Sequence, residues 1–162
     1  MNTITRISRC TTTSTHEDPF ARKYGFPLPA ALRSIASGLT WQEFNDRFGS
    51  TAGPLRLGSW TDNGRTAGTT DYVATLAVAD RIDTARATAP GPIGALTSML
   101  YDAGYGLEIL AFHQRETVDG TATFVHCEQG GRRQWSVALG PDAADSARRA
   151  IVAAANMLGR HS

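Results

Sequence analysis

The sequence has little of what marks membrane, nucleic-acid-binding or disulfide-rich proteins. Its 162 residues contain two cysteines, Cys10 and Cys127, and no stretch approaches the roughly 20 apolar residues of a membrane span. The 16 basic residues are scattered among 15 acidic ones, so no basic face for a phosphate backbone is predicted. The first residues, MNTITRISRC, lack the apolar core of a signal peptide. We therefore expect a cytoplasmic protein with neither a nucleic-acid nor a membrane partner.

Composition divides the chain into three segments. Residues 1–18 are rich in Thr, Ser and charged groups with nothing to bury, which predicts a disordered tail. Residues 19–52 are predicted to form a helical linker segment of two short helices, with Pro29 at a helix start and Thr40 and Glu43 at capping-box spacing. The main domain is predicted over residues 53–162.

The main domain shows one pattern twice. Three strand-like segments precede a helix that begins near Pro92 and is ended by Gly104, and three more precede a helix from Pro141. The strand-like segments are residues 55–60, 71–79, 83–89, 105–116, 121–128 and 133–140. A repeat of this kind predicts an α+β fold of duplicated βββα units, in which two three-stranded antiparallel sheets each carry a helix.

Both predicted helices follow a Gly-Pro step, but their first turns differ. Proline at the first helical position loses an N–H group that would be unpaired in any case. After Pro141, Asp142 and Asp145 complement the positive end of the helix, whereas the first turn after Pro92 contains no acid. The earlier helix therefore leaves its N–H groups available, and a carboxylate is a suitable guest. A solvated helix end with small residues for packing is the alternative interpretation.

Several stretches resemble one known family. GPIGALTSMLYDAGYGLEILAFHQ is similar to the Gly-Asn-Gly-Pro loop, helix and following strand in the C-terminal regulatory domain of α-isopropylmalate synthase. RQWSVALGPDAADSARRAIVAAANML is similar to the closing part of that domain, and KYGFPLPAALR resembles the connector that follows the family's catalytic barrel. The resemblance covers about residues 22–160 and implies the same duplicated βββα fold.

The resemblance also implies a ligand site. In the family this domain dimerises, and leucine binds near the dimer interface between the two halves. The residues implied here are Ala89, Gly91, Pro92, Ile93, Gly94, Ile109, Phe112, Glu116 and Thr121. Helix N–H groups would receive the carboxylate, and the apolar members would enclose an aliphatic side chain. The resemblance makes leucine or a related small carboxylate the expected ligand. Ala89-Pro90 stands where the family has Gly-Asn, which stiffens the loop and removes the Asn side chain.

A homodimer is expected on two grounds. One is the resemblance to a dimerising domain. The other is a helix face of small residues, Ala147, Ala150 and Ala154, which would permit close approach of a second copy. A separate catalytic barrel subunit is an alternative partner, since the connector and linker resemble those that follow the family's barrel.

The chain is not expected to be an isopropylmalate synthase by itself. A (β/α)8 barrel needs roughly 250 residues, and the four histidines of this chain form no HxH pair, so we expect no metal and no cofactor. Whether it is an enzyme stays open. A small-molecule binding and regulatory module is the preferred interpretation. The alternatives are an accessory subunit of a separate synthase barrel and an enzyme recruited onto the same fold for a small biosynthetic substrate, with Glu116, His113 and His126 as candidate catalytic groups.

Overall fold

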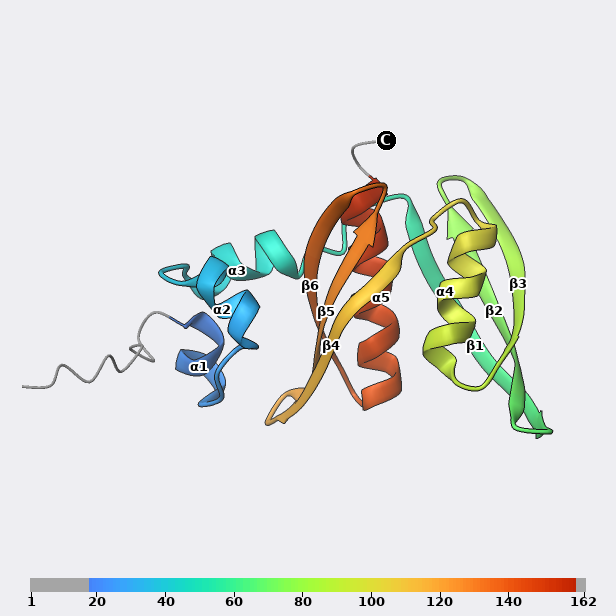
Figure 1. The fold of residues 1–162 in the computed structure, drawn as a ribbon, viewed down its shortest axis with the longest axis horizontal. Helices are drawn as coiled ribbons and strands as arrows, with labels where there is room; N and C mark the ends of the chain where they lie inside the picture. The colour runs from blue at the N-terminus through green and yellow to red at the C-terminus, as the bar shows by residue number, and fades with distance from the viewer. Residues whose placement is uncertain (1–17, 160–162) are drawn as a thin grey trace, which may run out of the picture. The chain divides into compact units, whose positions relative to one another are not determined.

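The computed structural model describes residues 18–159, which belong to two compact units divided after Phe44 (Figure 1). The first unit contains α1 (Pro19–Tyr24), α2 (Ala30–Ala36) and the start of α3 (Trp41–Phe48), which continues into the second unit. The sequence predicted two helices in this region, and the structure has three. The additional helix, α1, is only six residues long and therefore shows no amphipathic period in the sequence.

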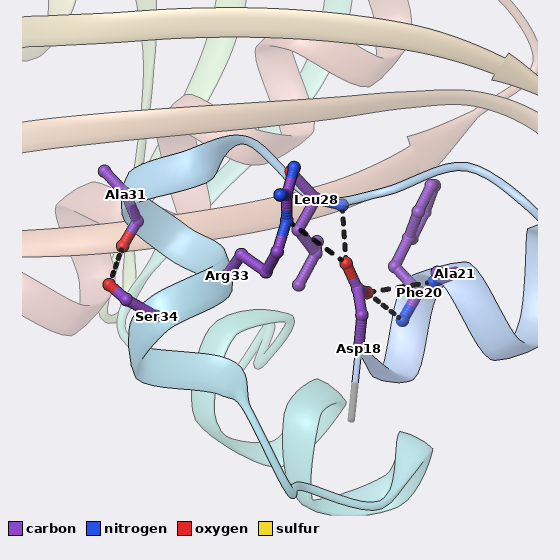
Figure 2. Close-up of polar contacts among 7 residues, drawn as sticks. All are labelled: Asp18, Phe20, Ala21, Leu28, Ala31, Arg33 and Ser34. Carbon is purple, nitrogen blue, oxygen red and sulfur yellow. Dashed lines mark hydrogen bonds and ion pairs between the residues drawn. The ribbon is translucent and has the colours of Figure 1, made fainter. Parts of the chain in front are cut away.

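Asp18 organises the start of the first unit. Its carboxylate accepts hydrogen bonds from the backbone N–H groups of Phe20 (3.0 Å), Ala21 (2.9 Å) and Leu28 (2.8 Å) (Figure 2). The first two bonds cap α1, and the third ties the approach to α2 to the same side chain. Asp18 is buried, although the sequence placed it at the end of the polar tail. The rest of that predicted tail lies outside the described residues.

The capping box at the start of α3 is confirmed. Thr40 N–H donates to Glu43 Oε2 at 3.0 Å, and Glu43 N–H donates to Thr40 Oγ1 at 3.1 Å. These reciprocal bonds satisfy two backbone donors that a helix start would otherwise leave unpaired.

The second unit confirms the duplicated α+β fold. Strands β1, β2 and β3 form one antiparallel sheet, here called sheet A, and β4, β5 and β6 form another, sheet B. Each sheet is followed by one helix. The elements are β1 (Leu55–Thr66), β2 (Thr69–Val78), β3 (Arg81–Ala89), α4 (Pro92–Asp102), β4 (Glu108–Thr117), β5 (Gly120–Gln129), β6 (Arg132–Gly140) and α5 (Ala143–Gly159).

The first hairpin is longer than the sequence predicted. The predicted strand-like segments end at residue 60 and resume at residue 71, but β1 runs to Thr66 and β2 starts at Thr69. Only Ala67 and Gly68 lie between them, with φ of 51° and 83°, as in the two-residue turns that match strand twist. Two register shifts in β1 interrupt the apolar alternation, and for this reason the sequence pattern hid the second half of the strand.

The two helices lie side by side between the sheets and run in the same direction (Figure 1). α5 packs mainly on β5 and β6, while α4 packs on β3. One core cluster draws on both halves: Leu55, Leu76, Leu96, Leu100, Val125, Cys127, Ala150, Ile151, Ala154, Ala155 and Leu158. The two βββα repeats therefore share a hydrophobic core and depend on each other for its burial.

The alanine face of α5 is buried within the chain. Ala147 is 4% exposed, and Ala150 and Ala154 are fully buried, the latter two in the shared core. Their small side chains let α5 approach its own core closely. The inference of a dimer from these alanines is therefore wrong, because the face that would have met a second copy is already covered. Of the two sequence-based grounds for a homodimer, only the family resemblance remains.

Side chains of α5 also fasten it to β1 of the other half. Asn156 accepts a hydrogen bond from Leu55 N–H and donates one to Leu55 C=O, both at 2.9 Å. The Arg148 guanidinium carbon lies 5.0 Å from the centre of the Trp60 ring, within the range of a cation–π contact. These contacts join the two repeats through polar groups as well as through the core.

Cys127 is fully buried in this core, and burial raises the pKa of its thiol to about 12. A raised pKa means less thiolate at a given pH, roughly a thousandfold less at pH 8 than for a free cysteine. We expect a Cys10→Ser variant, which keeps only this thiol, to react with a disulfide reagent very slowly when folded and completely after unfolding in urea. Rapid labelling of the folded variant would contradict this placement.

Candidate functional site

The start of α4 has the open character that the sequence predicted. Gly91 is the N-cap residue, Pro92 occupies the first turn, and no side chain caps the helix. An added Cβ at Gly91 would meet nothing within 4 Å, and one at Gly94 would meet only Ala89 Cβ, at 3.8 Å. The first turn contains no acid. Its N–H groups and the positive end of the helix are therefore accessible to an anion.

The start of α5 is closed by contrast. Asp142 Oδ1 accepts a hydrogen bond from the N–H of Asp145 at 2.8 Å, which is a side-chain cap. The Asp145 carboxylate pairs with Arg149 at 2.5 Å and with Arg148 at 3.9 Å. An added Cβ at Gly140 would lie 2.6 Å from the backbone nitrogen of Ser146. The second Gly-Pro step is thus filled by the chain's own groups and serves packing.

A bulge in β4 places two of the predicted ligand residues on the same face of sheet B. Ile109 pairs with Cys127, Ala111 with His126 and Phe112 with Val125, so Leu110 is the extra residue. Directly opposed residues point to the same face of a sheet. Since Cys127 and Val125 belong to the core beside α5, Ile109 and Phe112 also face α5, and both border the shared core. Simple alternation would have separated them.

The nine predicted ligand residues form more than one group. Ala89 and residues 91–94 lie within six positions of one another, at the end of β3 and the start of α4. Glu116 pairs with Thr121 at the β4–β5 hairpin, at the same end of the unit as the start of α4 (Figure 1). Ile109 precedes Glu116 by seven positions on β4, about 23 Å at roughly 3.3 Å per residue. One amino acid cannot touch both residues of the same chain.

The three candidate catalytic residues are not brought together. Glu116 is exposed and lies on the α5 face of β4, the same face as Gln114, whose Nε2 donates to Thr123 Oγ1 at 2.9 Å. His113 pairs with Phe124 and lies on the opposite face, as does His126. The sheet itself therefore separates the proposed base from both imidazoles.

The two histidines take part in a ring stack instead. His126 lies parallel to Trp135, with centroids 4.7 Å apart and an interplanar angle of 3°, and His113 lies 6.3 Å from the same ring. Partial burial, reinforced by the positive charge of Arg133 and opposed by Glu128, lowers the pKa of His126. The neutral imidazole is the form that stacks at neutral pH, which suits a structural role on this face of the sheet.

A hollow of about 340 Å³ lies at the opposite end of α4 from the predicted site. It is bordered by the end of β2, by β3 and by the last turn of α4, and none of the nine predicted ligand residues lines it.

Within residues 18–159 no group of three or more His, Cys, Asp and Glu side chains is arranged to hold a metal ion. None of the helices there combines the length and apolar content that crossing a membrane requires.

The fold and the open end of α4 define an α+β domain of two βββα repeats with an anion-accessible helix start. No protein-family model matches the chain. The chain is similar to 2-isopropylmalate synthase of Renibacterium salmoninarum, with 25% identity over 135 residues. That match covers 75% of this chain and 23% of the synthase, so the chain spans about a quarter of the length of this relative.

Proposed function

We propose that this chain is a regulatory-type domain that binds a small carboxylate, leucine or a close relative, at the start of α4. The observation that carries the proposal is the contrast between the two helix starts. α5 is capped and neutralised by Asp142 and Asp145, whereas α4 in the equivalent position has neither a side-chain cap nor an acid. The partial similarity to 2-isopropylmalate synthase supports a role related to a part of that enzyme.

The chemistry of this end suits an aliphatic carboxylate. Backbone N–H groups of the first turn supply hydrogen bonds to the carboxylate oxygens, and the helix dipole favours negative charge there. Ile93 borders the shared core beside this end and offers apolar surface to the ligand's side chain. Because Gly91 and Gly94 leave open space, the ligand can approach the backbone directly.

We further propose that the complete site requires a homodimer. Ile109 and Glu116 are too far apart along β4 for one small ligand to contact both within a chain. A second copy related by a two-fold axis could bring its own β4 residues to the start of α4. Light scattering on the purified protein should then give twice the chain mass. A monomer at micromolar concentration in saturating leucine would refute this part of the proposal.

The binding test introduces into α4 the acidic residue that α5 has at the equivalent position. Asp145 is three residues after the N-cap of α5, and Gly94 is three residues after the N-cap of α4. A Gly94→Asp substitution would place a carboxylate where the ligand's carboxylate is proposed to bind. We expect the free protein to be equally or slightly more stable, and leucine affinity to fall at least about tenfold.

The affinity of the Gly94→Asp variant is measured by calorimetric titration with leucine, isoleucine, valine and their 2-oxo acids. Gly94→Asn is the uncharged control of similar size. The control should keep most of the affinity, since it adds no charge. Absence of submillimolar binding by every compound would refute the proposed function. Equal binding by the Gly94→Asp and Gly94→Asn variants would place the ligand elsewhere.

A further inference from the structure

Asn63 and Gly64 lie in a bulge of β1. The register with β2 shifts between Asp62 and Arg65, and neither Asn63 nor Gly64 has a partner residue on β2. Gly64 has a φ of 79°, outside the strand region, and an added Cβ there would meet nothing within 4 Å. Asn63 is exposed, and within residues 18–159 its side chain makes no hydrogen bond. The sheet therefore holds these two residues less firmly than their neighbours.

This placement matters because of the chemistry of asparagine. The carbonyl carbon of its side-chain amide, Cγ, can be attacked by the backbone nitrogen of the following residue. In a regular strand the ladder keeps the backbone extended, which holds that nitrogen away from Cγ. A glycine after the asparagine has no Cβ to hinder the approach. Asn63-Gly64 is the only Asn-Gly pair in the sequence, and it lies where the ladder is interrupted.

We propose that Asn63-Gly64 is a site of spontaneous covalent modification, at which a cyclic imide forms and opens to isoaspartate. The backbone nitrogen of Gly64 bonds to Asn63 Cγ and loses its proton to solvent, while the Cγ–NH2 bond breaks and ammonia leaves. Water then opens the imide ring. Opening at the backbone carbonyl of Asn63 gives isoaspartate, and opening at Cγ gives aspartate. Either product replaces a neutral amide with a carboxylate, and no oxidant or reductant is required.

The fold should tolerate this modification. Isoaspartate routes the chain through Cβ and so adds one carbon to the backbone of β1. The residues of β1 that contribute to the shared core, Leu55, Leu57 and Trp60, all precede the bulge. The part of β1 that follows it leads only to the hairpin turn at Ala67. We therefore expect a folded product that is altered near the tip of the first hairpin. The proposal does not depend on the function proposed for the start of α4.

Isoaspartate formation tests the proposal. The purified chain is incubated at mildly alkaline pH, either folded in buffer or unfolded in urea, and peptide mapping by mass spectrometry locates the product. An isoaspartate methyltransferase with S-adenosylmethionine measures its amount. On folding, the rate at Asn63 should fall by less than about tenfold. The rate at Asn156 should fall by more than about tenfold, because this buried side chain reacts only after the structure opens.

Two variants supply the controls. Asn63→Gln should abolish the product at this position, because the longer side chain would have to close a larger and less favoured ring. Asn45→Gln makes the same change in α3 and should leave the rate at Asn63 unaltered. In the modified protein, changes of amide chemical shifts should be confined to residues 62–72. The proposal is overturned if folding slows the reaction at Asn63 tenfold or more, or if Asn63→Gln leaves the amount of isoaspartate unchanged.

Discussion

Replacing Asn156 with leucine is expected to lower the free energy of unfolding by about 3 kcal/mol, or roughly 9 °C in Tm. Asn156 is 1% exposed and makes two hydrogen bonds to the backbone of Leu55, which is equally buried. A leucine side chain fills similar volume but leaves the N–H and C=O of Leu55 without partners. Buried polar groups of this kind cost about 1–3 kcal/mol each when they lose their partners.

Urea denaturation of the purified variant measures this effect. Asn63→Ala, at an exposed position of β1, is the control and should change stability by less than about 0.5 kcal/mol. Asn156→Asp keeps an acceptor for Leu55 N–H but sets a carboxylate against Leu55 C=O, so it should also destabilise. If Asn156→Leu were as stable as the unaltered chain, the link between β1 and α5 would contribute nothing to holding the two repeats together.

Alanine substitutions at the two Gly-Pro steps are expected to have opposite outcomes. At Gly140 an added Cβ would lie 2.6 Å from Ser146 N and 2.9 Å from Ser146 Cα, both backbone atoms that cannot move aside without displacing α5. Overpacking of this kind costs up to about 3 kcal/mol. Ser146 also bonds to Thr123 Oγ1 at 2.6 Å and to Ala138 C=O at 3.0 Å, so its displacement would disturb those contacts as well.

At Gly91 the same substitution meets nothing within 4 Å, and φ is −154°, which any residue adopts. Gly91→Ala should leave the protein as stable as before or up to about 1 kcal/mol more stable, because alanine restricts the unfolded chain. Its effect should appear in ligand binding instead, through the methyl group at the edge of the site. Thermal unfolding of the Gly91→Ala and Gly140→Ala variants measures the change in stability at each position. A loss of stability at Gly91 similar to that at Gly140 would show that both steps serve packing.

Local features of the fold were predictable because short-range chemistry determines them. Gly104 ends α4 at φ 94°, and the following N–H of Tyr105 bonds to Leu100 C=O at 2.7 Å. The capping box of Thr40 and Glu43 forms as predicted. The two βββα repeats follow from strand alternation, helix period and turn residues, all of which are encoded within about 20 positions.

The candidate site was predictable only where it depends on neighbouring residues. The absence of an acid in the first turn after Pro92 is visible in the sequence itself, and the structure confirms that no side chain caps the start of α4. The position of Ile109 and Phe112 on one face of sheet B could not be predicted from the sequence, because a bulge at Leu110 reverses the alternation of side chains along β4. The separation of Glu116 from His126 likewise depends on which face of the sheet each side chain takes.

The sequence by itself determined the order of elements, the duplication, and the difference between a helix start that carries acids and one that does not. Each of these is a local property of the chain. The tertiary structure alone decided that Ala150 and Ala154 lie in the core and that Asn156 pairs with a residue 101 positions away. These depend on contacts between segments distant in sequence, whose register and approach are set by packing of the whole unit.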